Sequence, residues 1–128
     1  MNYATLFRPI ALPVSVLALS VALPAPGFAQ PTRLSAAFGN TVVSTYPDGR
    51  QSRLWLNADQ TYQLRGRRGG MSSGTWRLSG ERLCLRQRRP ASIPISICRP
   101  VPQVRLGSQW TDTAQGGVRI TLRLVPGR

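Results

Sequence analysis

Strict alternation of apolar and polar side chains near the C-terminus is the feature that most constrains this chain. Val118, Ile120, Leu122 and Leu124 occupy every second position, with arginine or threonine between them. Side chains of a β-strand point alternately to opposite faces, so this period of two indicates a strand with one buried face. Shorter runs of the same kind recur along the chain, separated by turn residues such as the Pro-Asp-Gly at 47–49. The pattern predicts an antiparallel meander.

The individual elements can be placed from these runs. We expect a short helix or lid over 34–38, capped by Gly39, and then strands at 41–46, 53–56, 61–65, 74–78, 82–86, 93–98 and 118–124. The Pro-rich segment 99–117 has no clear assignment, and Trp55 and Trp110 have no predicted face. One face of the strands is apolar, including Tyr62 and Trp76, whereas the other is mostly arginine and threonine. We therefore predict an all-β fold with seven to eight strands, either a single small antiparallel meander barrel or a curled sandwich.

The first thirty residues have the features of a cleavable export signal. A thinly basic segment ends at Arg8, an apolar run follows over 10–23, and Gly27 and Ala29 are the small residues that a signal peptidase reads. A buried helix or membrane anchor is the alternative, but the run is short and Pro13 interrupts it. We predict cleavage after Ala29, one domain over 30–128, and a periplasmic or secreted location.

The only two cysteines, Cys84 and Cys98, could form a metal site, a redox site or a disulfide. Zinc would need further ligands and the chain has no histidine, while the C-x-x-C spacing of redox sites is absent. In an oxidising compartment a disulfide is the expected outcome. Antiparallel pairing of the two cysteines on an outer face would also set Leu85 opposite Ile97 in the core. The disulfide and the core therefore require the same register.

The composition offers few of the side chains that catalysis commonly uses. Without histidine no Ser-His or Cys-His pair can form, and the chain has four acidic residues. Asp59 and Glu81 could meet as a glycosidase-like pair at one end of the meander, although acids that stabilise turns are the simpler interpretation. The sequence predicts a non-enzymatic protein with no catalytic residue, no metal ligand and no cofactor.

The positive charge has a pattern. All seventeen basic residues are arginine, and the formal net charge is +13. In a meander alternate turns emerge at the same end, which predicts an anion-binding cluster, here called the arginine rim, made of Arg50, Arg65, Arg67, Arg68, Arg86, Arg88 and Arg89. Arginine matches phosphate and carboxylate geometry, so the expected partner is an anionic envelope component, either lipid phosphate or acidic polysaccharide. A GC-rich coding sequence would also favour arginine, and that explanation stays open.

Two segments carry a resemblance to a known group of proteins. The series N-A-D-Q-T-Y, followed by G-T-W-R-L-S-G-E-R-L-C-L and a downstream cysteine, resembles small exported bacterial domains with a lipocalin-like barrel. The likeness covers about 46–98, and Gln60 stands where those domains usually have glycine. It implies a fold and an exported location more than an activity.

Three functions remain open from the sequence. The first is a non-enzymatic exported binding domain that uses the arginine rim, for which nucleic acid is not an expected partner because no exposed aromatic platform is predicted. The second is a protein-binding module, such as an enzyme inhibitor, that uses the disulfide-stapled loop 86–93. The third is a ligand carrier or weak hydrolase that uses the mouth of the barrel, which a closed, polar-lined pocket would favour.

Overall fold

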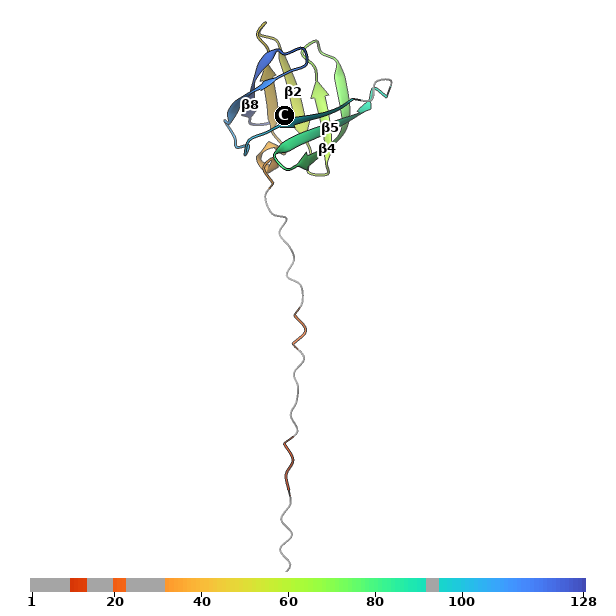
Figure 1. Ribbon diagram of the computed structural model, residues 1–128, viewed down its shortest axis with the longest axis vertical. Coiled ribbons are helices and arrows are strands. Elements are labelled where there is room, and N and C mark those ends of the chain that lie inside the picture. The colour runs from red at the N-terminus through yellow and green to blue at the C-terminus, as the bar shows by residue number, and fades with distance from the viewer. Residues whose placement is uncertain (1–9, 14–19, 23–31, 92–94) are drawn as a thin grey trace, which may run out of the picture.

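The computed structural model describes residues 10–13, 20–22, 32–91 and 95–128, and its body is a curled β-sheet (Figure 1). A short 3₁₀ helix, η1 (Ser35–Ala37), precedes eight strands: β1 (Thr41–Thr45), β2 (Gln51–Leu56), β3 (Thr61–Arg65), β4 (Met71–Ser79), β5 (Arg82–Arg89), β6 (Ser96–Pro100), β7 (Gln109–Thr113) and β8 (Arg119–Val125). All are antiparallel members of one sheet in the order β6-β5-β4-β3-β2-β1-β8-β7.

The order of strands explains the shape. Each of β2 to β6 pairs with its predecessor in sequence, and β1 also pairs with β8, so the sheet curls into a nearly closed barrel. The two edge strands, β6 and β7, form no ladder with each other in the part of the chain that the structure describes. The prediction of a small all-β barrel is confirmed, with eight strands.

The strand that sequence analysis did not assign is β7. Its inward positions carry Trp110 and Asp112, which pair across with Leu122 and Ile120 of β8. A strand whose inner face mixes an aromatic ring with a carboxylate has no simple apolar alternation, which is why the segment 99–117 could not be assigned. The predicted strand 93–98 begins at Ser96 in the structure, and residues 92–94 lie outside the described part of the chain.

The register between β5 and β6 is the predicted one. Cys84 stands opposite Cys98 and is bonded to it, and Leu85 stands opposite Ile97. Both cysteines occupy outer positions between inward residues, although Cys84 is buried there. Disulfide and core therefore do share one register.

One end of the barrel is closed by two segments that are distant in sequence. Leu34 and Ala37, around η1, are buried against the core together with Val104. The backbone N–H of Val104 donates to the carbonyl of Arg33 (2.9 Å), and Arg33 Nη1 donates to the carbonyl of Val101 (3.0 Å). Figure 1 shows η1, in orange, at the foot of the barrel. We call this end, residues 34–37 and 101–104, the closed end.

The opposite end carries the turns 46–50, 66–70 and 114–118, because alternate turns of an antiparallel sheet emerge together. We call it the open end. The first and last strands are tied at the closed end, where Thr41 Oγ1 donates to the carbonyl of Gly127 (2.7 Å) and accepts from Trp55 Nε1 (2.9 Å). Within the described residues, no helix has the length and apolar character needed to cross a membrane.

Candidate functional site

The barrel encloses a cavity of about 400 Å³. Its walls are mostly apolar and come from inward positions of six strands: Val42, Leu54, Leu56, Leu64, Leu83, Leu85, Ile97, Ile120 and Leu122. Trp110 adds an aromatic ring from the remaining lining strand, β7. A volume of this size lies in the range of pockets that hold small molecules, which are typically apolar with a few placed polar groups.

The cavity opens at one end. The lining residues at the closed end, such as Leu34 and Val104, are almost fully buried. The exposed lining residues are Arg67 and Gln115, in turns of the open end, and Pro100 and Thr113, on the edge strands β6 and β7. A molecule can therefore reach the cavity from the open end and along the gap between the two edge strands.

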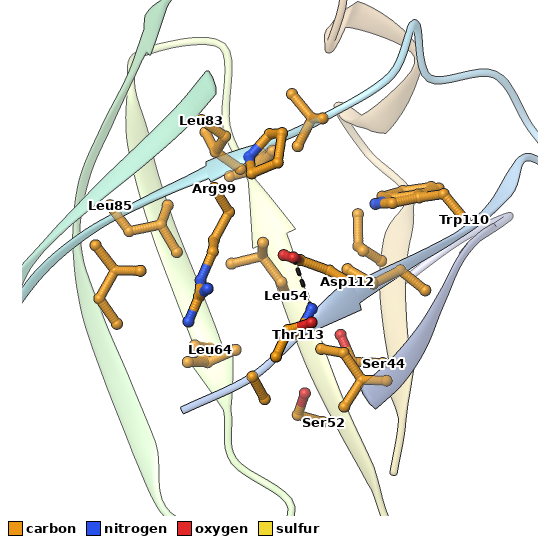
Figure 2. A pocket seen from close by; sticks show the side chains of 18 of the residues that line it. Ser44, Ser52, Leu54, Leu64, Leu83, Leu85, Arg99, Trp110, Asp112 and Thr113 are labelled. Atoms are coloured by element: carbon orange, nitrogen blue, oxygen red, sulfur yellow. Dashed lines mark hydrogen bonds between the residues drawn. The ribbon is translucent and has the colours of Figure 1, made fainter. Parts of the chain in front are cut away.

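Polar side chains line the half of the cavity nearer the open end. Ser44 and Ser52 stand directly opposite each other on β1 and β2, and both are buried. Across the cavity, Arg99 of β6 and Asp112 of β7 point into the same space (Figure 2). The Arg99 side chain extends from β6 toward Leu64. The cavity is thus apolar at its floor and polar near its mouth.

Arg99 is the most unusual of these side chains. It is half-buried, and it faces inward because it follows Ile97 by two positions in β6. The described residues offer it neither an ion pair nor a hydrogen-bond acceptor within bonding distance. A guanidinium has five N–H donors, so its donors face the cavity without a protein acceptor.

Asp112 is only partly engaged. Its Oδ1 accepts a hydrogen bond from the backbone N–H of Thr113 (2.7 Å), which Figure 2 shows as a dashed line. The ion pairs among the described residues join Arg33 to Glu81 and Arg50 to Asp48, so Arg99 and Asp112 face the cavity without bonding to each other.

Trp110, which had no predicted face, lies on the inner side of β7. Its Nε1 is buried and has no hydrogen-bond partner among the described residues. Buried indole N–H groups usually find an acceptor, so this donor is a second polar group that the described residues leave unsatisfied.

The mouth of the cavity carries one member of the arginine rim. The guanidinium carbon of Arg67 lies 4.4 Å from the centre of the Tyr46 ring, a cation–π arrangement between the turns that follow β1 and β3. Both residues also line the cavity. Arg67 therefore connects the predicted rim with the interior.

The other rim arginines are all exposed. Arg50 and Arg68 lie in turns of the open end, Arg65 at the end of β3, and Arg88 and Arg89 at the end of β5. Arg86 is farther away, inside β5 opposite Thr75. The topology thus brings six of the seven predicted arginines to the end where the cavity opens. Their role in anion binding stays a prediction.

Asp59 and Glu81, the alternative glycosidase-like pair, each interact with a different residue. Asp59 accepts hydrogen bonds from the hydroxyl and backbone N–H of Thr61, and the hydroxyl contact is the main cause of a lowered pKa for Asp59. Glu81 lies 3.5 Å from Arg33 Nη2. Asp59 stabilises its turn, as the simpler interpretation predicted.

Sequence reasoning missed Arg99 and Asp112 as site residues. Arg99 continues the inward alternation of the isoleucines before it, which was the available signal. Asp112 gave no signal, because its strand was not recognised.

Comparisons with protein-family models, with curated proteins and with solved structures returned no match. The function is therefore argued from the cavity itself.

Proposed function

We propose that this chain is a non-enzymatic exported binding domain that holds the apolar part of a small anionic amphiphile inside its barrel. The ligand's anionic part would lie near the mouth, among the cavity arginine and the arginine rim. The Cys84–Cys98 disulfide supports folding in an oxidising compartment, and a periplasmic or secreted location is part of the proposal.

One observation carries this proposal: a cavity of about 400 Å³ with apolar walls opens at the end where six rim arginines gather. Apolar walls favour a molecule that gains by leaving water, and each buried methylene contributes about 0.8 kcal/mol. Surrounding positive charge favours an anion and raises its local concentration. An amphiphilic anion satisfies both conditions.

The proposal narrows the partners expected from sequence. An anionic lipid has an apolar part that can use the cavity, whereas an acidic polysaccharide has none and would use the rim alone. The inhibitor alternative relies on the loop 86–93, of which residues 92–93 lie outside the described part of the chain. The cavity gives that alternative no support.

The test is to fill the cavity. We expect the wild-type protein to bind the neutral fluorescent probe N-phenyl-1-naphthylamine saturably. The double variant Ser44→Leu/Ser52→Leu places two larger side chains in the lining and should lower the affinity at least tenfold, because each occupies space that the probe needs.

The matched control is Ser79→Leu/Ser96→Leu, which makes the same change at two exposed positions. It should bind the probe as the wild type does. Near-UV circular dichroism checks that both variants keep their tertiary packing. Absence of saturable binding by the wild type, or equal binding by the filled variant, would refute the proposal.

A further inference from the structure

We infer that the preferred ligand head group combines an anionic oxygen, bound by Arg99, with a hydrogen-bond donor, bound by Asp112, as in a hydroxylated carboxylate on a single apolar chain. The inference rests on the proposed function and names the class of ligand that the cavity selects.

The guanidinium of Arg99 favours an anionic hydrogen-bond acceptor in the cavity. Arg99 directs into this space a guanidinium that has neither an ion pair nor a hydrogen-bond acceptor among the described residues. Arginine forks match carboxylates in a bidentate geometry, and hydrogen bonds between ionised groups are stronger than neutral ones. A carboxylate near Arg99 therefore satisfies donors that the protein leaves open.

Asp112 sets a second requirement. Its carboxylate faces the same space, and within the described chain it accepts a hydrogen bond from the N–H of Thr113. A plain anion bound to Arg99 would lie near this negative charge and lose part of its binding energy. A hydroxyl next to the ligand carboxylate can donate to Asp112, which removes that cost and adds a charge-assisted hydrogen bond.

The polar gradient fixes the orientation. Leu34, Leu56 and Val104 form an apolar floor at the closed end, whereas Ser44, Ser52 and the two charged side chains lie nearer the mouth. The chain of the ligand should point to the floor and its head group to the mouth. At ~30 Å³ for each water-sized group, a cavity of about 400 Å³ holds about a dozen such groups. Chains of about twelve carbons should bind best.

The experiment displaces N-phenyl-1-naphthylamine with three ligands of equal chain length: 3-hydroxydodecanoate, dodecanoate and 1-dodecanol. The two acids are used below their micelle concentrations and the alcohol below its solubility limit. We expect the hydroxy acid to bind most tightly and the alcohol least tightly, with each step about threefold to tenfold. Arg99→Gln should bring dodecanoate to the level of the alcohol. Asp112→Asn should remove the advantage of the hydroxy acid over dodecanoate.

Arg77→Gln and Asp48→Asn make the same changes at exposed positions outside the cavity and should keep the wild-type order. Probe and alcohol binding report whether each variant still folds. If the order survives both cavity substitutions, or if the hydroxy acid and dodecanoate bind the wild type equally while the alcohol binds more weakly, this inference is wrong and the proposed function stands. If the wild type binds all three ligands equally, the preference for an anion fails as well and only binding of an apolar chain remains. If the wild type does not bind the probe, the proposed function itself fails.

Discussion

Gln60 has a backbone conformation that normally belongs to glycine. Its φ is +67°, and it is the one non-glycine residue with a positive φ in the described chain. The turn between β2 and β3 requires this, since the N–H of Gln60 donates to the carbonyl of Asn57 (3.1 Å) before the chain enters β3. Gln60 also stands where the exported domains suggested by the sequence motifs usually have glycine. An L-residue in this region costs about 1–2 kcal/mol.

Replacing Gln60 with glycine should therefore stabilise the protein. The gain is reduced by the extra freedom of glycine in the unfolded chain, which leaves an increase of up to about 1 kcal/mol. Urea unfolding followed by tryptophan fluorescence measures it. Gln60→Ala retains a Cβ and should bring no such gain, so equal stabilisation by both variants would contradict the conformational explanation.

At the scale of elements, β4 and β5 meet at an irregular point. Their register shifts between Ser73 and Gly74, where Ser73 stands opposite Arg89 and Gly74 opposite Gln87. Arg88 is the extra residue of this β-bulge. A Cβ at Gly74 would lie 1.9 Å from the carbonyl oxygen of Arg86, a backbone atom that cannot move alone. Only glycine at position 74 of β4 leaves room for the backbone of β5.

Gly74→Ala should destabilise the protein by about 1–3 kcal/mol, the usual cost of forcing an extra carbon into a packed position. Gly70→Ala is the control, since a Cβ there would meet nothing within 4 Å. Thermal unfolding of the two variants gives the comparison. Comparable melting temperatures would show that the bulge accommodates a side chain.

Strands with a largely apolar inner face were predicted, whereas β7, whose inward positions carry Trp110 and Asp112, was not. β8 was recognised from Ile120, Leu122 and Leu124, which do line the interior. β4 begins three residues before its predicted start, because its early inward positions carry Ser72 and Gly74 rather than large apolar residues. Periodicity detects burial of apolar surface, so strands and strand ends with polar or small inward residues are harder to detect.

At the scale of the whole molecule, charge is unevenly placed. Six arginines of the rim lie at the open end together with Asp48, whereas Asp59 and Glu81 lie in turns near the closed end. This arrangement followed from alternate turns of a meander and could be predicted. The cavity could not be predicted, because its size depends on how far the sheet curls and its charged lining on Arg99 and Asp112, which face it from two edge strands that are not paired.

The rim can be tested against the net charge. Replacing Arg67, Arg68, Arg88 and Arg89 with glutamine should weaken binding to vesicles that contain an anionic phospholipid by tenfold or more. The reason is that all four substitutions remove contacts with lipid phosphates from the same end of the barrel. It should also flatten the dependence of affinity on salt concentration. Cosedimentation at two salt concentrations measures both effects.

The matched control neutralises four exposed arginines outside the predicted rim, Arg77, Arg119, Arg123 and Arg128, with the same change in net charge. We expect a much smaller loss of affinity from this variant. Equal losses would mean that attraction to the vesicles is diffuse. If neither variant loses affinity for the vesicles, a GC-rich coding sequence is the better explanation of the arginine content.

The pairing of β1 with β8 also gives the molecule an order of assembly. Thr41 stands opposite Val125, almost at the end of the chain, whereas β1 to β6 can form as local hairpins while the rest of the chain is still absent. Contacts so distant in sequence form late and slow the final step of folding. Until the last strand arrives, the apolar face of the meander is open to water and to other chains. A polypeptide that crosses a membrane from its N-terminus would therefore complete its barrel only after β8 emerges.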